Sequence, residues 1–118
     1  MGKLTTHVLD TLHGRPAAGM RVRLERVGAD GACSPLVDLH LDPDGRAAAP
    51  LLEGAALVAG RYRLVFALAA YFRAQGVALA EPPFLDEVCI DFGVADALAN
   101  YHVPLIASPY SYSTYRGS

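Results

Sequence analysis

Histidine is the side chain best suited to exchange a proton near neutral pH, because its ordinary pKa of about 6.5 lies close to working pH. The 118-residue sequence contains His7, His13, His40 and His102. His13 lies in a turn and His40 alternates with two aspartates, so we expect both to be solvated surface residues. His7 and His102 are therefore the candidates for activating a water molecule.

The surroundings of His7 and His102 are similar although the two residues lie near opposite ends of the sequence. Apolar and polar residues alternate over 4–10 and again over 101–107. Successive side chains of a strand point to opposite faces, so a core-facing Val8 would turn His7 outward, and a core-facing Val103 would do the same for His102. A single outward histidine is most often only solvated. The pair indicates a site only if the fold brings the two strands together.

Arg46 is a candidate for binding an anion or a polar ring. It follows the turn Asp42-Pro43-Asp44-Gly45, where a charged residue is commonly just exposed. A guanidinium keeps its charge and offers a planar fork of donors, which suits a ligand with neighbouring oxygen and nitrogen atoms. The residue type and the turn allow both interpretations.

The segment 108–118 is rich in tyrosine and hydroxyl side chains and closes with Tyr115-Arg116-Gly117-Ser118. Aromatic faces beside hydroxyl groups suit the recognition of a small planar polar molecule. Gly117 would let the backbone approach a neighbour where no side chain fits. An edge strand with exposed tyrosines would have the same composition, so this alternative stays open.

Short strands separated by turns must position these residues. Period-two alternation occurs over 20–25, 37–41, 61–66 and 88–94, and a period of two is typical of half-buried strands. With 4–10, a strand near 50, 101–107 and the closing segment, the pattern predicts an all-β sandwich of about eight strands. One helix is predicted over 69–75, because good helix formers precede Gly76, a typical C-terminal cap.

The bulk composition limits the class of protein. Hydrophobic residues make up 53% and charged residues 19%, which is typical of a folded chain, and we expect one domain over residues 1–118. The net charge of −2 and the lack of a basic stripe argue against nucleic acid as a partner. No apolar run is long enough to span a membrane, and the first residues do not form a typical signal peptide.

Several other kinds of site are not predicted. The histidines lack the spacing of a zinc site, no G-x-S-x-G motif is present, and the glycines are scattered at turns rather than gathered in a phosphate loop. We therefore expect neither a metal nor another cofactor. Cys33 and Cys89 lack metal or redox spacing, and we expect free thiols in a reducing cytoplasm.

Three segments taken together resemble one known family. They are Leu4-Thr5-Thr6-His7-Val8-Leu9-Asp10-Thr11 with Gly14-Arg15-Pro16-Ala17, then Tyr101-His102-Val103-Pro104-Leu105 with Ser108-Pro109, and finally Tyr115-Arg116-Gly117-Ser118. Over essentially its whole length the chain resembles the 5-hydroxyisourate hydrolases, the enzyme branch of the transthyretin-like family. The closing tetrapeptide is the most specific element, because the hormone-carrying branch lacks it.

The resemblance implies a transthyretin-like (prealbumin-like) β-sandwich and a metal-independent hydrolase without cofactors. The implied reaction opens 5-hydroxyisourate to 2-oxo-4-hydroxy-4-carboxy-5-ureidoimidazoline in urate degradation. The implied assembly is a homotetramer, a dimer of dimers with its sites at the dimer–dimer interface, in the cytoplasm.

The resemblance also implies which residues contact the substrate, the first three of them catalytic: His7, Arg46, His102, Tyr115, Arg116 and Ser118. Which histidine acts as the base stays open. One position departs from the family pattern, since Asn100 stands where the family commonly has a histidine.

Two other functions remain possible at this point. A transthyretin-type carrier would bind a small aromatic ligand in the same channel, but it would not require His7, Arg46 or the closing tetrapeptide. A structural or adhesion sandwich would explain the strands but not the polar closing segment.

Overall fold

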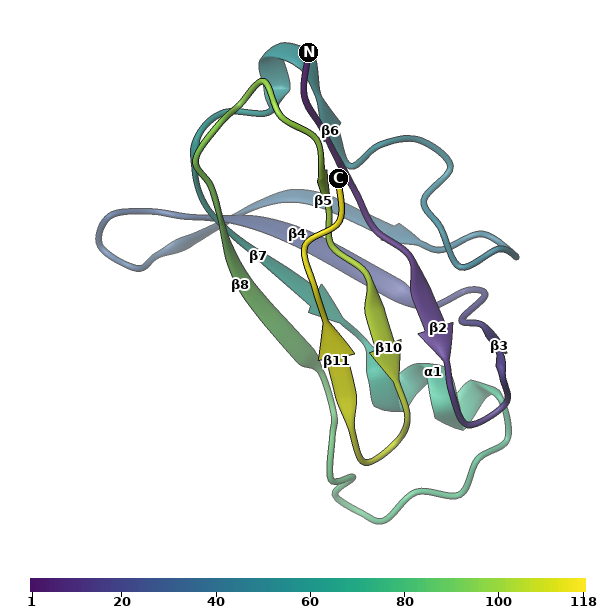
Figure 1. Cartoon of the computed structure of the whole chain (residues 1–118). Helices are drawn as coiled ribbons and strands as arrows, with labels where there is room; N and C mark the ends of the chain where they lie inside the picture. The colour runs from purple at the N-terminus through teal and green to yellow at the C-terminus, as the bar shows by residue number, and fades with distance from the viewer.

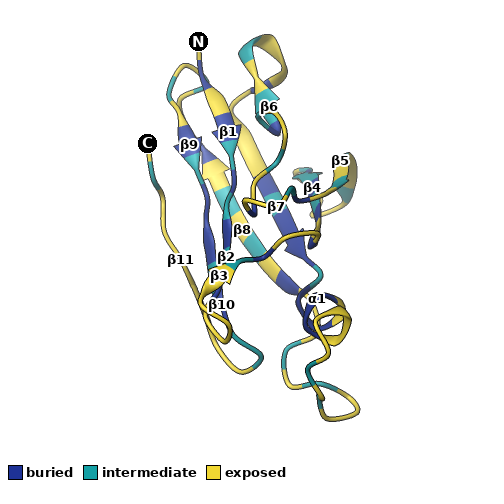
Figure 2. Ribbon diagram, turned by 90° about the vertical axis from the view of Figure 1, so that its right-hand side faces the viewer, coloured by how far each residue is buried: buried dark blue, intermediate teal, exposed yellow.

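Two layers of β-sheet pack face to face, with one short α-helix at one end (Figures 1 and 2). The computed structural model describes all 118 residues. The predicted all-β sandwich with a single short α-helix is confirmed. No helix has the length and apolar character of a membrane-crossing segment.

The first layer is an antiparallel sheet in the order β5-β4-β7-β8. Its strands are β4 (Arg21–Val27), β5 (Cys33–His40), β7 (Gly60–Phe66) and β8 (Val88–Val94). All four were predicted from alternation; β4, β7 and β8 lie within two residues of the predicted ends, whereas β5 begins four residues before the predicted 37–41. Their inward side chains include Val22, Leu24, Tyr62, Leu64 and Phe66, which are all buried. This layer forms the wall against which the second layer packs.

The second layer brings the two ends of the sequence together. One sheet has the order β6-β1-β9 and the other β11-β10-β2-β3. Their bounds are β1 (Lys3–Thr5), β2 (Val8–Asp10), β3 (Arg15–Pro16), β6 (Leu52–Glu53), β9 (Tyr101–His102), β10 (Leu105–Ala107) and β11 (Tyr112–Thr114). β1 leads into β2 and β9 into β10, and both pairings between them are parallel. Strands from near both ends of the sequence are therefore neighbours, and Figure 1 shows β2 beside β10.

Two strands predicted as continuous are each divided into two. The first is interrupted at Thr6 and His7, where His7 forms an isolated bridge with Arg46. The second is interrupted at Val103 and Pro104, and a proline has no N–H to donate to a ladder. Irregular backbone therefore lies beside both predicted histidines.

The core lies between the two layers, as the buried positions in Figure 2 show. It contains 21 buried residues, among them Leu4, Val8, Val103 and Leu105. Because these four face inward, His7 and His102 lie on the outer face of the second layer, as predicted. Both histidines are half-buried.

The helix α1 (Leu68–Ala74) follows β7 and covers one end of the core. Its buried face includes Leu68 and Phe72. Gly76 has a φ of 83°, and its N–H donates to the carbonyl oxygen of Arg73 at 3.0 Å. This positive φ ends the helix without strain because glycine has no Cβ, and the predicted helix at 69–75 is confirmed with a shift of one residue.

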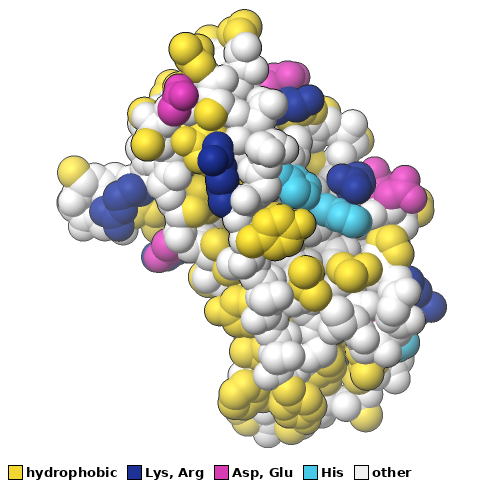
Figure 3. Space-filling model, in the orientation of Figure 1, with side chains coloured by type: hydrophobic (Ala, Val, Ile, Leu, Met, Phe, Trp, Pro, Cys, Tyr) yellow, Lys and Arg dark blue, Asp and Glu magenta, His cyan; other side chains and the backbone are white.

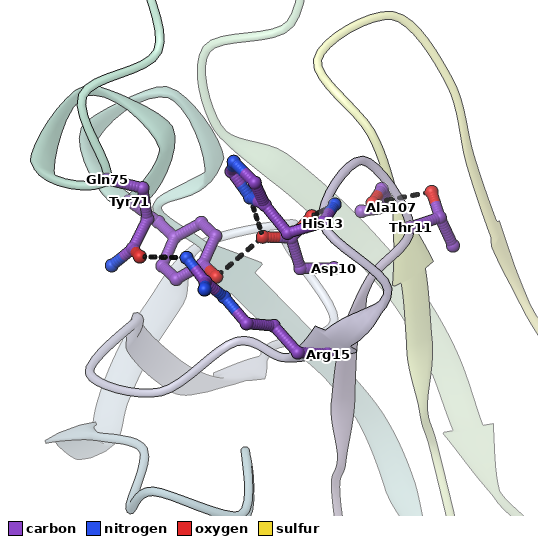
Figure 4. Close-up of polar contacts among 7 residues, drawn as sticks. All are labelled: Asp10, Thr11, His13, Arg15, Tyr71, Gln75 and Ala107. Atoms are coloured by element: carbon purple, nitrogen blue, oxygen red, sulfur yellow. Dashed lines mark hydrogen bonds and ion pairs between the residues drawn. The ribbon is translucent and has the colours of Figure 1, made fainter.

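A polar cluster connects β2 to α1 (Figure 4). Asp10 is 1% exposed, and its Oδ2 accepts from the Tyr71 hydroxyl at 2.7 Å and lies 2.6 Å from Nδ1 of His13. Burial acts to raise the pKa of Asp10, but these bonds outweigh it, so the pKa lies below its ordinary value. His13 is an exposed turn residue, as expected, and its ring also partners this buried carboxylate.

Candidate functional site

A tight turn places Arg46 beside His7. The Asp42 carboxylate accepts from the backbone N–H groups of Asp44 at 2.9 Å and of Arg46 at 3.1 Å. Gly45 has a φ of 72°, and a Cβ on it would lie 2.6 Å from the carbonyl oxygen of Val8. Only glycine allows this approach, so the Asp-Pro-Asp-Gly sequence fixes the position of Arg46 next to β2.

His7 and Arg46 are joined by an antiparallel bridge, and the N–H of Val8 donates to the carbonyl oxygen of Gly45 at 2.9 Å. The Arg46 residue is exposed, whereas His7 is half-buried. A solvent-exposed cation thus lies next to a histidine held by backbone on both sides, since the His7 carbonyl oxygen also accepts from Leu105 N–H at 2.9 Å.

His102 is held between the first strand and the closing tetrapeptide. The parallel register pairs it with Thr5, whose Oγ1 lies 2.9 Å from Nδ1 of the imidazole. On its other side His102 exchanges two backbone hydrogen bonds with Gly117, of 3.1 and 2.7 Å. A Cβ on Gly117 would lie 3.1 Å from Cβ and 3.2 Å from Cδ2 of His102. The prediction that Gly117 permits a close backbone approach is confirmed.

The two histidines and Arg46 are electrostatically coupled. Burial, followed by the positive charges of Arg46 and His7, lowers the pKa of His102 below its ordinary value. Both charges act on the His102 ring, so the three predicted residues lie near one another.

The closing tetrapeptide contributes to both faces of its sheet. The pairings Leu105↔Thr114 and His102↔Gly117 follow one antiparallel register, which places Tyr115 on the face that carries His102. Tyr115 is 58% exposed there. Arg116 alternates to the opposite face, so the structure gathers only part of the tetrapeptide around the histidines.

The Arg116 guanidinium is occupied within the chain. Its Cζ lies 4.4 Å from the centre of the Tyr101 ring, and its Nη2 donates to the carbonyl oxygen of Asn100 at 3.0 Å. The contact uses the backbone of Asn100 rather than its side chain. Ser118 is exposed. In this chain Arg116 therefore anchors the closing segment, away from the two histidines.

A cleft of about 250 Å³ borders the predicted residues, lined by Lys3, Thr5, Thr6, Arg46 and residues 47–50. Its wall includes Thr5, the partner of His102, and Arg46, the neighbour of His7. The space-filling view in Figure 3 shows a central patch of histidine atoms on this face, with basic side chains on either side and apolar atoms adjacent; a second, small histidine patch lies at the lower right edge. Cationic, hydroxyl and imidazole groups therefore share one surface.

Two other cavities are larger than this cleft. One of about 270 Å³ lies between β8 and the closing segment and is lined in part by Tyr101, Tyr115 and Arg116. The largest, about 460 Å³, lies beside α1 and contains none of the predicted site residues. Size alone therefore does not locate the site, and we assign it by the chemistry of the groups that converge.

Sequence reasoning gave no role to Thr5 or Lys3. Both lie on the outer face of β1, two and four residues before His7. The period-two pattern that placed His7 on this face therefore places them there as well. What the pattern lacked was the pairing of Thr5 with His102, two residues 97 positions apart.

The arrangement suits hydrolysis of a polar ring. A neutral imidazole can take a proton from water, and a second imidazole or a guanidinium can stabilise the negative charge that develops on a carbonyl oxygen. No group of three histidine, cysteine or acidic side chains lies in an arrangement that would hold a metal ion.

Comparison with known proteins supports these expectations. The model of the HIUase/transthyretin family matches residues 4–117. The chain is 54% identical to the 5-hydroxyisourate hydrolase of Ralstonia nicotianae, over 100% of both chains. It is 35% identical to the solved 5-hydroxyisourate hydrolase of Klebsiella pneumoniae, with a TM-score of 0.81 over 100% of both chains.

Sea bream transthyretin, solved in complex with thyroxine, is 27% identical, with a TM-score of 0.85 over 98% of this chain and 94% of the other. These likenesses confirm the transthyretin-like sandwich. The backbone resembles the carrier as closely as the enzyme, so the fold does not separate them, whereas sequence identity favours the enzyme branch.

Proposed function

The chain belongs to the HIUase/transthyretin family, and we propose on this premise that it hydrolyses 5-hydroxyisourate to 2-oxo-4-hydroxy-4-carboxy-5-ureidoimidazoline in urate degradation. The single observation that carries the proposal is the 54% identity, over the full chain, with a relative of that name. The proposed hydrolase unit spans residues 1–118.

The proposed reaction adds water across a ring amide bond. The water oxygen bonds to the ring carbonyl carbon, and the carbon–nitrogen bond then breaks. One proton of the water passes through an imidazole to the ring nitrogen, and the other leaves with the new carboxylic acid, which ionises. His7 and His102 would supply the imidazoles, and their proximity to Arg46 supports this role.

Arg46 would bind the ring oxygens and stabilise the negative charge of the tetrahedral intermediate. Its exposure leaves the guanidinium fork free for this contact, and a donor of this kind is commonly worth about 3 kcal/mol in the transition state. The bridge to His7 supports a shared ligand, because a ring held by Arg46 would lie within reach of that imidazole.

Tyr115, Arg116 and Ser118 complete the proposed substrate-binding set. Tyr115 would contact the planar ring, since its strand register supports a position beside His102. The stacking of Arg116 on Tyr101 suggests that it also holds this segment in place. Gly117 keeps the backbone against His102.

The proposed enzyme is a homotetramer, a dimer of dimers with the sites at the dimer–dimer interface. The cleft beside Arg46 is open to solvent, and the partly exposed Leu9 and Ile106 share the outer face with the histidines. A second subunit would cover this mixed face and exclude water. A chain that stays monomeric in analytical ultracentrifugation and still turns over substrate would contradict this assembly.

A cytoplasmic location is part of the proposal. The structure has two free cysteines, Cys33 and Cys89, which are compatible with a reducing compartment. Fractionation of the source cells with an antibody to the chain would test it.

The activity is tested by spectrophotometry. Urate and urate oxidase generate 5-hydroxyisourate in place, and its near-ultraviolet absorbance should disappear faster when the chain is added. A transthyretin-type carrier, the alternative function, would leave the decay unchanged. Binding of thyroxine without any acceleration of the decay would favour the carrier.

The site residues are tested by alanine substitution. His7→Ala, Arg46→Ala and His102→Ala should each reduce turnover at least tenfold, as loss of a general acid–base or a charge-stabilising donor commonly does. Unchanged melting temperatures would show that the fold is intact. Near-normal turnover in any of the three would remove that residue from the mechanism.

A further inference from the structure

We propose that Thr5 is a positioning residue that holds His102 with its proton on Nε2, so that His102 donates a hydrogen bond to the reacting carbonyl oxygen and His7 is the base. The inference rests on the proposed hydrolysis and assigns a different role to each of the two histidines. It is carried by the contacts around the His102 ring.

The first observation is geometric. Thr5 and His102 are direct neighbours in the parallel pairing of β1 with β9, and both side chains lie on the outer face. The distance of 2.9 Å between Oγ1 and Nδ1 is that of a good hydrogen bond. Gly117 packs against the ring edge at Cδ2. With Nδ1 bound and one edge covered, Nε2 is the ring atom left to meet a ligand.

The second observation concerns the hydroxyl proton. Thr5 Oγ1 has no hydrogen-bond partner in the chain other than Nδ1 of His102. A hydroxyl oxygen tolerates an unused lone pair, but a half-buried donor without an acceptor is costly. In the proposed arrangement the hydroxyl donates to Nδ1, and a neutral imidazole that accepts at Nδ1 carries its proton on Nε2.

The third observation is the charge around the ring. Burial of the ring, and then the charges of Arg46 and His7, disfavour a second proton on His102. A neutral ring that presents N–H cannot accept a proton from water, but it can donate to the developing oxyanion. His7, which has no side-chain hydrogen bond in the chain to tie up either ring nitrogen, is then the imidazole left to take the proton from water.

The neighbouring threonine shows that this role is not general to the strand. The Thr6 hydroxyl donates to the backbone carbonyl oxygen of Val103 at 2.7 Å and is buried on the inner face. It reinforces the pairing of the strands without touching a histidine. Thr5 differs because its only partner is a ring of the proposed site.

The direct test is the protonation of His102 in the free protein. Two-bond ¹H–¹⁵N correlation spectra distinguish a protonated Nε2 from a protonated Nδ1 in a neutral imidazole. We expect His102 at about pH 7.5 to carry its proton on Nε2. A proton on Nδ1 would overturn the proposal, because Thr5 would then be the acceptor and Nε2 the base.

The kinetic test replaces the hydroxyl by a methyl group. Thr5→Val should lower kcat about fivefold to tenfold with KM within about twofold, the effect of losing one neutral hydrogen bond in the transition state. Thr5→Ser, which restores the hydroxyl, should recover most of the rate. Wild-type kcat in Thr5→Val, or a Thr5→Ser variant as slow as Thr5→Val, would refute the role.

Thr11→Val is the matched control. The Thr11 hydroxyl donates to the carbonyl oxygen of Ala107 at 2.9 Å in the same layer but touches no site residue (Figure 4). The Thr11→Val variant should lose a hydrogen bond of similar structural importance, while its kcat stays near the wild-type value. If the wild-type chain did not accelerate the decay of 5-hydroxyisourate, the proposed function would fail, while the spectra would still report whether Thr5 fixes the His102 proton.

Discussion

Adding one methyl group at Gly117 should slow the enzyme while leaving the fold intact. In Gly117→Ala the new Cβ would lie 3.1 Å from Cβ and 3.2 Å from Cδ2 of His102. Carbon atoms in contact prefer about 3.5–4.0 Å, so the ring or the strand must move by a few tenths of an ångström. The hydrogen bond to Thr5 restrains the ring, and the displacement is transmitted to Nε2.

The size of the effect follows from that displacement. A misplacement of about 1 Å in an active site can cost about a hundredfold in rate, so a shift of a few tenths of an ångström corresponds to roughly a fivefold to tenfold loss in kcat. Because no positive φ is required at Gly117, alanine adds no backbone strain there. The free energy of unfolding should therefore change by less than about 1 kcal/mol.

The assay is the decay of 5-hydroxyisourate, with thermal melting as the measure of fold. Gly93→Ala is the matched control, since a Cβ at Gly93 meets no atom within 4 Å, and its kcat should stay within about twofold of wild type. Gly117→Ala with full activity would refute the argument that close packing at this position sets the His102 ring.

Three further predictions concern ionisable groups. Asp10→Asn should cost about 1–3 kcal/mol of unfolding free energy at pH 7 in urea titrations, because the buried partner of His13 loses its charge. Since the folded pKa of Asp10 is depressed, that contribution is present above its ordinary value of 3.8 and is lost as pH falls through the lower folded pKa, so the gap between variant and wild type should close in acid. Burial and Asp10 raise the pKa of Tyr71 to about 12, so its contribution, present below the ordinary 10.0, should be lost as pH rises through about 12, and Tyr71→Phe should remove that alkaline loss. The lowered pKa of His102 predicts that its ring titrates below 6.5 in an NMR pH titration of the free protein, and a midpoint above that value would contradict the shift.

The outward placement of His7 and His102 could be predicted because it depends on local alternation. Val8 and Val103 are apolar, each is next to a histidine, and a strand sends neighbours to opposite faces. The Asp-Pro-Asp-Gly turn likewise predicted a tight reversal before Arg46, and Gly45 confirms it with its positive φ. These features are set by residues that are close in sequence.

The convergence of the site could not be predicted from the pattern. It depends on the parallel register of β1 with β9, between segments 97 residues apart, and a shift of one residue would have turned one histidine into the core. The roles of His7, Arg46 and His102 came from the family resemblance instead. The contact of Thr5 with His102 and the stacking of Arg116 on Tyr101 could not be predicted for the same reason, because each joins residues that are distant in the sequence.

His13 lies in an exposed turn, as its sequence context predicted, but it also has a structural partner that the turn did not reveal. Its turn position indicated a solvated residue, yet Asp10, three residues earlier, is buried by α1 and requires a donor. The need arises from Tyr71 and the helix, which pack on β2 from a distant part of the chain. A turn residue can thus stabilise the fold because a distant element buries its partner, which the sequence of the turn alone does not show.

The most direct measurement compares the decay of 5-hydroxyisourate in three parallel reactions, with the wild-type chain, with the double variant His7→Ala, His102→Ala, and with no protein. Hydrolysis at the outer face of the second layer predicts rapid decay with the wild type and the spontaneous rate in the other two. A double variant that folds normally and still accelerates the decay as fast as wild type would place the chemistry elsewhere in the molecule.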